Sequence, residues 1–207
     1  MTSRTGTRSG APETERPAAE AEQRLLDAAR DAFAAKGYHG TSTREIAAGA
    51  GMSPAAMYIH FRSKQYVLAR LSIEGHVSAL ARLTAAATPP GSPTKRLRAA
   101  VYAFAHWHAE NTTTARVVQY ELSHLDPASH VQVVRLRREI VDTVRSIVAD
   151  GSRVGDFAVA DVDTTTLAVL SLCIDTARWY PSRELDTPDA VGASLAAMAE
   201  RMVGAVG

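Results

Sequence analysis

The sequence predicts an all-α protein of about nine helices. From residue 20 onward, apolar residues recur at the three- and four-residue spacings of helices, and no long stretch alternates as a strand does. Hydroxyl or acidic residues followed by proline stand where several helices are expected to begin. With 46% hydrophobic residues in a chain of 207, the protein can bury a core without disulfides or metal ions.

The chain is expected to begin with a flexible arm over residues 1–19. These residues are rich in threonine, serine, glycine, proline and charge, and they have no apolar periodicity. The first helix follows, because Leu25, Ala29 and Phe33 share one narrow apolar stripe. Gly37 can adopt the left-handed conformation that ends such a helix.

Two short helices are predicted next, between residues 42 and 64. Ser42 and Glu45 have the spacing of a capping box, which starts a helix over 43–50. Gly51 can end that helix, and Ser53 then caps another helix that starts with proline. Helices joined by so few residues must cross steeply, as in a helix-turn-helix, whose second helix can enter the major groove of DNA.

The second of these helices, from Pro54 to about His60, contains no acidic residue, so an anion can approach it. Its first amides and the nearby hydroxyl groups can hold phosphate oxygens, and Arg44, Arg62 and Lys64 add positive charge. The alternative is a tight corner in an ordinary helical bundle. The candidate DNA contacts are Thr41, Ser42, Thr43, Arg44, Ser53, Pro54, Ala55, Met57, Tyr58, His60 and Lys64.

The residues around this motif resemble the signature of the TetR family of transcription regulators. The matching strings are GYHGTSTREIA at 37–47, AGMS at 50–53 and YIHFRSK at 58–64, and the resemblance covers roughly residues 24–71. It implies a homodimer that binds a palindromic operator, represses transcription and releases the DNA when a small-molecule effector binds.

The resemblance also assigns roles to individual residues. Base edges and phosphates would be contacted by Thr43, Arg44 and residues 53–57, and the DNA backbone by Tyr58, His60 and Lys64. The sequence departs from the family where Gln65 and Tyr66 replace the usual carboxylates. Arginines of the arm are further possible DNA contacts, although a solvated tail is the simpler interpretation.

Further helices are expected after the one that starts near Lys64. The proline-rich string at 88–93 separates that helix from the next, whose apolar stripe resumes at Leu97. Another helix carries a sustained stripe that should end before Gly151. The last three helices are expected to begin at Asp126, Asp163 and Thr187.

Polar residues interrupt the apolar faces of these later helices. Such groups need partners, which can be other side chains, water or a ligand. We expect a ligand pocket bordered by Phe104, Trp107, His108, Asn111, Tyr120, Glu121, His124, Asp175 and Arg178. For any one of these residues, a satisfied hydrogen bond in the core is the simpler alternative.

Three short strings resemble the regulatory domains of TetR repressors of sterol and fatty-acid catabolism. They are QYE at 119–121, HL at 124–125 and RWYP at 178–181. This resemblance implies an acyl-CoA or another lipid-like carboxylate as effector, with Arg178 as its anion partner.

The final two helices are expected to form the dimer, because their many small residues let helices approach closely. The alternative is ordinary packing within one chain. The candidate interface residues are Leu167, Leu170, Ile174, Val191, Leu195, Met198 and Met202. The expected domains are therefore a DNA-binding domain over 20–66 and a ligand-binding and dimerisation domain over 67–207.

Other classes of protein find little support. Cys173 is the single cysteine, which excludes an intramolecular disulfide, and His106 and His108 point apart on a helix, so no metal site is expected. No hydrolase, P-loop, dinucleotide or zinc-protease motif is present, so we expect no catalytic residue and no cofactor. A net charge of +1 argues against a non-specific DNA-coating protein. The absence of a signal peptide or membrane span predicts a cytoplasmic location.

Overall fold

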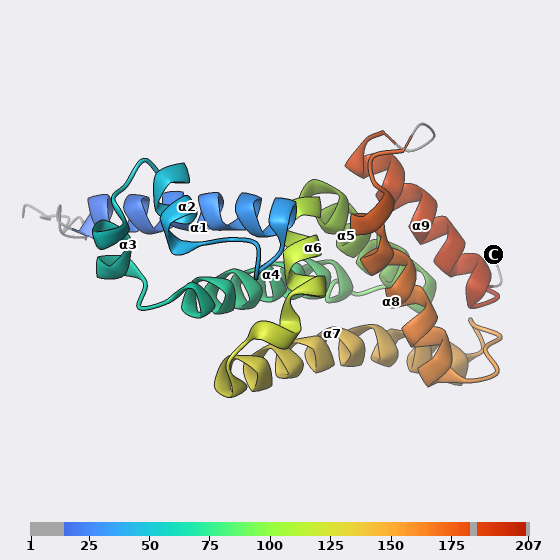
Figure 1. The fold of residues 1–207 in the computed structure, drawn as a ribbon. Coiled ribbons are helices and arrows are strands. Elements are labelled where there is room, and N and C mark those ends of the chain that lie inside the picture. Colours follow the sequence, from blue (N-terminus) through green and yellow to red (C-terminus); the bar gives the residue numbers. More distant parts are fainter. Residues whose placement is uncertain (1–14, 183–185, 206–207) are drawn as a thin grey trace, which may run out of the picture. The chain divides into compact units, whose positions relative to one another are not determined.

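The computed structural model describes residues 15–182 and 186–205, and in this range it contains nine α-helices, one 3-10 helix and no strand (Figure 1). The prediction of an all-α fold is confirmed. The chain divides into two compact units between Val67 and Leu68. The elements are α1 (Glu15–Lys36), α2 (Thr43–Gly49), α3 (Pro54–His60), α4 (Lys64–Ala87), α5 (Pro93–Glu110), α6 (Thr112–Tyr120), η1 (Leu122–His124), α7 (Pro127–Val154), α8 (Val162–Trp179) and α9 (Pro188–Met202).

The first unit is built by α1, α2 and α3, each of which packs against the other two (Figure 1). Its core contains Phe33 of α1, Ile46 of α2 and Met57 of α3, all fully buried. Helices of seven residues are not stable alone, so α2 and α3 depend on this shared core. The expected arm lies mostly outside the described residues, and α1 already begins at Glu15 rather than at residue 20.

The second unit is arranged around α5, which packs against α7, α8 and α9 (Figure 1). Leu97, Val101 and Phe104 of α5 are buried, as the predicted stripe requires. At Gly192 of α9 a Cβ atom would lie 2.9 Å from the ring of Tyr102, so glycine permits the close approach of α9 to α5. The single cysteine, Cys173, lies in this core, and burial raises the pKa of its thiol to about 12.

Two helix boundaries in this unit differ from the prediction. Gly151 does not end its helix: α7 continues to Val154, and Gly155 takes the left-handed conformation, with φ of 85°. Gly151 is instead a packing site, because a Cβ atom there would overlap the ring of Phe157. The next helix, α8, is capped by Asp161 rather than by Asp163.

Within the described residues, no helix is long and apolar enough to cross a membrane. The same part of the chain holds no group of three or more histidine, cysteine or acidic side chains placed to bind a metal ion.

Candidate functional site

The turn between α2 and α3 has the geometry that the sequence predicts. The hydroxyl of Ser42 accepts a hydrogen bond from the N–H of Glu45, and the Glu45 carboxylate accepts one from the N–H of Ser42, which completes the capping box. Gly51 has a φ of 70°, and the N–H of Met52 bonds the carbonyl of Ala47 at 2.8 Å. Ser53 then caps α3 by accepting from Ala56. The chain therefore turns sharply and re-enters a helix within four residues.

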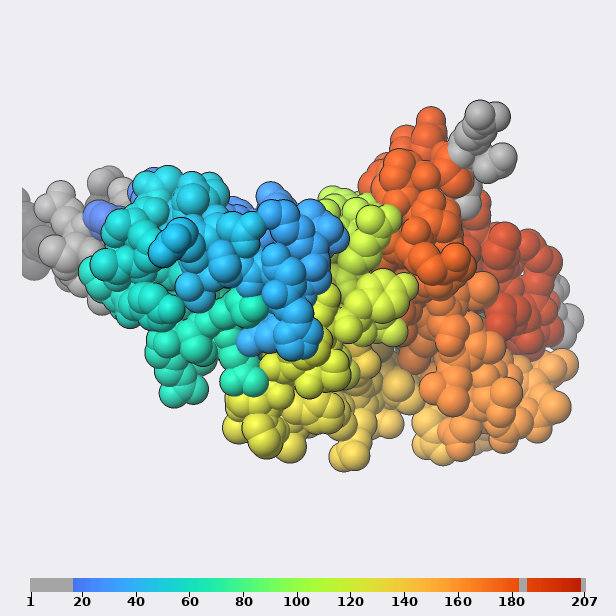
Figure 2. Space-filling model, viewed as in Figure 1, coloured from blue at the N-terminus to red at the C-terminus, as the bar shows by residue number. Residues whose placement is uncertain are grey.

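The outward face of this motif carries polar side chains, and its second helix, α3, contains no acidic residue. Arg44, Ser53, Ala55 and Tyr58 are exposed, and Tyr58 is 53% exposed. Its hydroxyl lies 3.4 Å from that of Thr43, so the side chains of α2 and α3 meet at this surface. In Figure 2 the atoms of α2 and α3, cyan to teal, form a surface that nothing covers in that view.

Two of the candidate DNA contacts lie in the interior instead. Met57 is 0% exposed and belongs to the core, so it is not available to a base. Thr41 is 2% exposed, and its hydroxyl donates toward the carbonyls of Ala32 and Gly37. Met57 was named as a contact because it lies on the second helix of the motif, but one face of this short helix packs against the core and does not reach solvent.

Lys64 and His60 make internal contacts as well. The ammonium of Lys64 donates to the carbonyls of Tyr38 and Thr41, each at 2.7 Å, and lies 4.2 Å from the centre of the Tyr38 ring. Two of its three protons are thus used to hold the loop after α1. The ring of His60 lies 4.0 Å from the carboxylate of Glu22, and its side chain is largely covered.

Two exposed side chains outside the list of candidate DNA contacts belong to this surface, and one of them, Arg62, was expected only to add positive charge nearby. Ile59 of α3 is 81% exposed, although it is apolar. Arg62 is exposed, and its guanidinium lies 4.7 Å from the centre of the Tyr66 ring. The signal for Ile59 was its place next to Tyr58, on the side of α3 opposite to the buried Met57.

The acidic residue of α2, Glu45, forms an ion pair with Lys36. Lys36 donates to Glu45 at 2.6 Å, and this bond, followed by bonds from Ser42, lowers the pKa of Glu45 to about 2. The carboxylate is therefore charged, but it is balanced by the ammonium and does not oppose an approaching anion.

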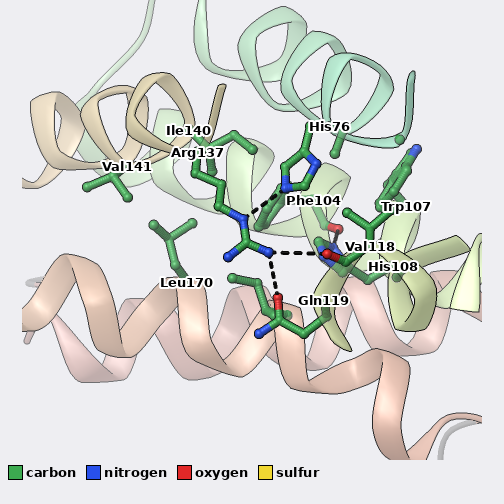
Figure 3. Close-up of a pocket in the computed structure, with 14 residues that line it drawn as sticks. His76, Phe104, Trp107, His108, Val118, Gln119, Arg137, Ile140, Val141 and Leu170 are labelled. Carbon is green, nitrogen blue, oxygen red and sulfur yellow. Dashed lines mark hydrogen bonds between the residues drawn. The ribbon is translucent and has the colours of Figure 1, made fainter. Parts of the chain in front are cut away.

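The second unit contains a partly open cavity of about 190 Å³ (Figure 3). Its walls come from α4, α5, α6, α7 and α8. Of the nine expected pocket residues, Phe104, Trp107 and His108 line it. The remaining walls are mostly apolar, with Ile140 and Leu170 among them.

The polar lining of this cavity is centred on Arg137 of α7. Its Nε donates to Nε2 of His76 at 3.0 Å, and its Nη2 to the side-chain oxygen of Gln119 at 3.1 Å and, more loosely, to the carbonyl of Val118 at 3.4 Å (Figure 3). His76 lies on α4, so the arginine ties three helices together. Neither Arg137 nor His76 was among the expected ligand residues.

Both buried histidines of the cavity are neutral, and each carries its proton on Nδ1. Nδ1 of His76 lies 2.7 Å from the carbonyl of Ser72, and Nδ1 of His108 lies 2.8 Å from that of Phe104. Because a carbonyl can only accept, each Nδ1 must be the donor. The pKa of each histidine is lowered to about 4, mainly by burial, and the charge of Arg137 contributes to the lowering for His76.

The other six expected ligand residues do not line this cavity. Tyr120 and Asp175 border a separate, open hollow between α6, α8 and α9. Arg178 is exposed and donates two hydrogen bonds to Asp175, at 2.8 and 2.7 Å, which raises its pKa. It is therefore a surface ion pair and not the cationic group of the cavity. The remaining three, Asn111, Glu121 and His124, line neither hollow.

The seven expected dimer residues differ in exposure: three are buried, three are exposed and Ile174 is half-buried. Leu170, Val191 and Leu195 are buried inside the single chain and cannot form an interface, because a partner cannot reach them. Leu167, Met198 and Met202 are exposed, although they are large and apolar. Ile174 is half-buried and lies at both the cavity and the open hollow.

These features define a class of protein: a helix-turn-helix unit with an exposed second helix that has no acidic residue, followed by a helical unit that contains a small cavity. Two family models match the chain. They are "Bacterial regulatory proteins, tetR family" over residues 25–71 and "Tetracyclin repressor-like, C-terminal domain" over residues 90–203. The chain belongs to the TetR family of transcription regulators.

Individual relatives agree with this assignment. A TetR-family regulatory protein from Rhodococcus RHA1 is 42% identical, with a TM-score of 0.86, over 90% of this chain and 98% of that one. The transcriptional regulator UidR of Escherichia coli K12 is 36% identical over 59 residues, 28% of this chain and only 30% of UidR. AibR, solved with isovaleryl coenzyme A and operator DNA, has a TM-score of 0.79 at 18% identity over 90% of this chain and all of that one, a likeness of fold alone.

Proposed function

We propose that this regulator is a homodimeric repressor that binds a palindromic operator in the cytoplasm and is released by a small-molecule effector. The observation that carries the DNA-binding part is the exposed face of α3, which has no acidic residue and is presented by a sharp turn. The major groove admits one helix, so α3 is the reading element and α2 supports it against the backbone.

Phosphates supply most of the affinity in this proposal, and bases few contacts. Ser42, Thr43 and Ser53 present hydroxyl groups, and Arg44 and Tyr58 reach outward next to them. Ala55 and Ile59 offer only apolar surface, which suits the methyl group of thymine. The operator is therefore expected to be short and to tolerate base changes, and binding should weaken steeply as the salt concentration rises.

Arg44 is expected to contact a phosphate of the DNA backbone. Arg44 is exposed and makes its contact to phosphate, so Arg44→Ala should weaken binding to operator and random DNA about equally and reduce the salt slope by about one. Arg135→Ala, on the exposed side of α7, is the matched control and should leave both affinities unchanged. A loss confined to the operator would assign Arg44 to a base instead.

The dimer is proposed to form on the face of α8 and α9 that carries Leu167, Met198 and Met202. Exposed apolar side chains on adjacent helices are what a helical dimer buries. Two-fold symmetry then repeats α3, which explains a palindromic operator.

The effector is proposed to occupy the cavity of about 190 Å³. AibR was solved with isovaleryl coenzyme A, and the short strings near Tyr120 and Arg178 point to acyl-CoA in the same way. Pockets for whole cofactors are typically about 300–1,000 Å³. The cavity therefore suits a compact carboxylate, or the acyl end of a thioester, better than an entire acyl-CoA.

Selection of bound sequences from random DNA tests the proposal. The expected product is a palindrome whose half-sites are about one helical turn apart. Light scattering of the same preparation should give the mass of a dimer. A selection without any palindrome, or a monomer at micromolar concentration, would reject the proposed mode of binding.

A further inference from the structure

We infer that the cavity of the second unit binds a small organic anion, a monocyclic or short branched carboxylate, through the guanidinium of Arg137. The inference deepens the proposed function, because it rests on the cavity being the effector site. It replaces Arg178, the anion partner that the sequence suggested, with a residue on a different helix.

The hydrogen bonds of Arg137 leave one end of its guanidinium free. Nε donates to His76, and Nη2 donates to Val118 and Gln119. Dashed lines in Figure 3 leave these two nitrogens, whereas the other terminal nitrogen carries none. Within the part of the chain that the structure describes, Nη1 thus has two N–H groups without a hydrogen bond, enough to hold a carboxylate oxygen.

The charge of Arg137 has no counter-ion among the described residues. Its three partners are neutral, and no carboxylate forms an ion pair with it in residues 15–182 or 186–205. Asp142 borders a shallow hollow that Arg137 also reaches, but it does not pair with the guanidinium. Arg137 is partly buried. Even partial burial of a charge without an opposite charge is unfavourable, and an anionic ligand would lessen that cost.

The state of His76 orients the arginine and favours an anion over a cation. Its Nδ1 proton is committed to Ser72, so Nε2 offers only a lone pair, and that lone pair accepts from Arg137. A cationic ligand would meet the guanidinium with like charge and would find no carboxylate on the cavity wall.

The rest of the cavity sets the size and the apolar character of the ligand. Phe104, Trp107, Ile140 and Leu170 surround the polar end with apolar walls. The cavity measures about 190 Å³, and a cavity of about 150 Å³ with such walls is known to hold benzene. One ring or a short branched chain with a carboxylate therefore fits.

Calorimetry and thermal unfolding of the full-length protein test this assignment. The probes are benzoate, phenylacetate and cyclohexanecarboxylate, each paired with its neutral carboxamide, at up to about 10 mM, where even millimolar ligands bind. For at least one pair the carboxylate should bind at least about tenfold more tightly than its amide and raise the melting temperature.

Variants separate the role of Arg137 from a general effect of charge. Arg137→Gln should weaken carboxylate binding at least about tenfold, whereas Arg138→Gln, the exposed neighbour on α7, and Arg178→Gln should leave it unchanged. If Arg137→Gln does not fold, Arg137→Lys tests the same point, because it keeps the charge and loses the fork of donors. The comparison of acid with amide on the unaltered protein does not depend on any variant.

Three results would overturn the inference: equal binding of acid and amide, unchanged binding of the acids by Arg137→Gln, or no binding of any acid in the panel. Selection from random DNA is run on the same preparation. A palindrome without carboxylate binding rejects this inference and leaves the proposed repressor standing. Carboxylate binding without a palindrome rejects the repressor and supports the anion site.

Discussion

Lys64 contributes to the stability of the DNA-binding unit as well as to its charge. Its ammonium donates to two carbonyls of the loop that follows α1, and it sits over the Tyr38 ring. This loop precedes α2, so the position of the reading motif depends on the same side chain. A substitution at Lys64 is therefore expected to affect the fold and, through the position of α2, DNA binding as well.

Lys64→Met is expected to lower the free energy of unfolding by about 1–3 kcal/mol, because two carbonyls lose a charged donor. Denaturant unfolding of the full chain measures the change. Lys36→Met is the control: its partner Glu45 is exposed, and an exposed ion pair contributes little to stability, so this substitution should have a much smaller effect. An equal effect of the two substitutions would contradict the structural role of Lys64.

Protonation of His76 and His108 is expected to make stability depend on pH. Both have a folded pKa near 4, below the ordinary value of 6.5, so as pH falls the unfolded chain binds the protons first. The free energy of unfolding should be highest above pH 6.5 and should fall, by a few kcal/mol, between pH 6.5 and 4.

Denaturant unfolding at pH 7.5 and 5 measures this loss, since carboxylates titrate mostly below that window. His108→Gln should reduce the difference between the two pH values. A pH dependence unaffected by this substitution would place its origin in other groups.

The sequence identified the residues of the cavity only in part. Phe104, Trp107 and His108 were found because they lie on the main stripe of α5. Arg137 and His76 were not singled out, because they lie on different helices 61 residues apart in sequence, and only the folded structure brings them within hydrogen-bond distance. Periodicity predicts which face of one helix is buried but not which helix covers it.

At the scale of the helices, four starts were predicted correctly, whereas the start at Asp163 and the end at Gly151 were not. Ser42, Ser53, Asp126 and Thr187 cap α2, α3, α7 and α9 as expected, because a cap is a local interaction between neighbouring residues. Gly151 was taken as a helix end, although it is helical and fits against Phe157. That contact involves tertiary packing, which local sequence does not specify.

Gly151→Ala is therefore expected to destabilise the protein by about 1–3 kcal/mol, although alanine favours a helix. The added Cβ atom would overlap the Phe157 ring, and the ring or α7 must shift. Thermal and denaturant unfolding give the change. Arg153→Ala, on the exposed side of α7, should change stability by less than about 1 kcal/mol, and a stabilising Gly151→Ala would show that the ring moves freely.

For the whole molecule, the proposed homodimer depends on the exposed apolar side chains of α8 and α9. Met198 and Met202 are each 40% exposed, and Leu167 is 57% exposed. Contact of these apolar side chains with water does not stabilise a monomer, whereas a dimer could bury them. Three of the residues that the sequence suggested for this face, Leu170, Val191 and Leu195, are equally apolar but face inward, because periodicity does not tell which neighbour covers a helix.

A Leu167→Glu, Met198→Glu double substitution is expected to yield a monomer that has lost most of its affinity for a palindrome. Light scattering and operator titration measure the two effects. The control is Val131→Glu, because Val131 is equally apolar and 68% exposed but lies on α7, away from the proposed face. A dimer that survives the double substitution would place the interface elsewhere.

The exposed side chain of Ile59 separates the stability of the protein from its activity. Its side chain is 81% exposed, so water surrounds a group that gains nothing from solvation, and a polar residue there would cost the isolated fold nothing. Selection for solubility or heat resistance alone would be expected to discard this isoleucine. In the proposed complex with DNA, a thymine methyl group covers this side chain. Ile59→Ser is therefore expected to melt no earlier than the parent but to bind the operator more weakly. Parallel melting and operator-titration curves measure this trade-off between stability and activity.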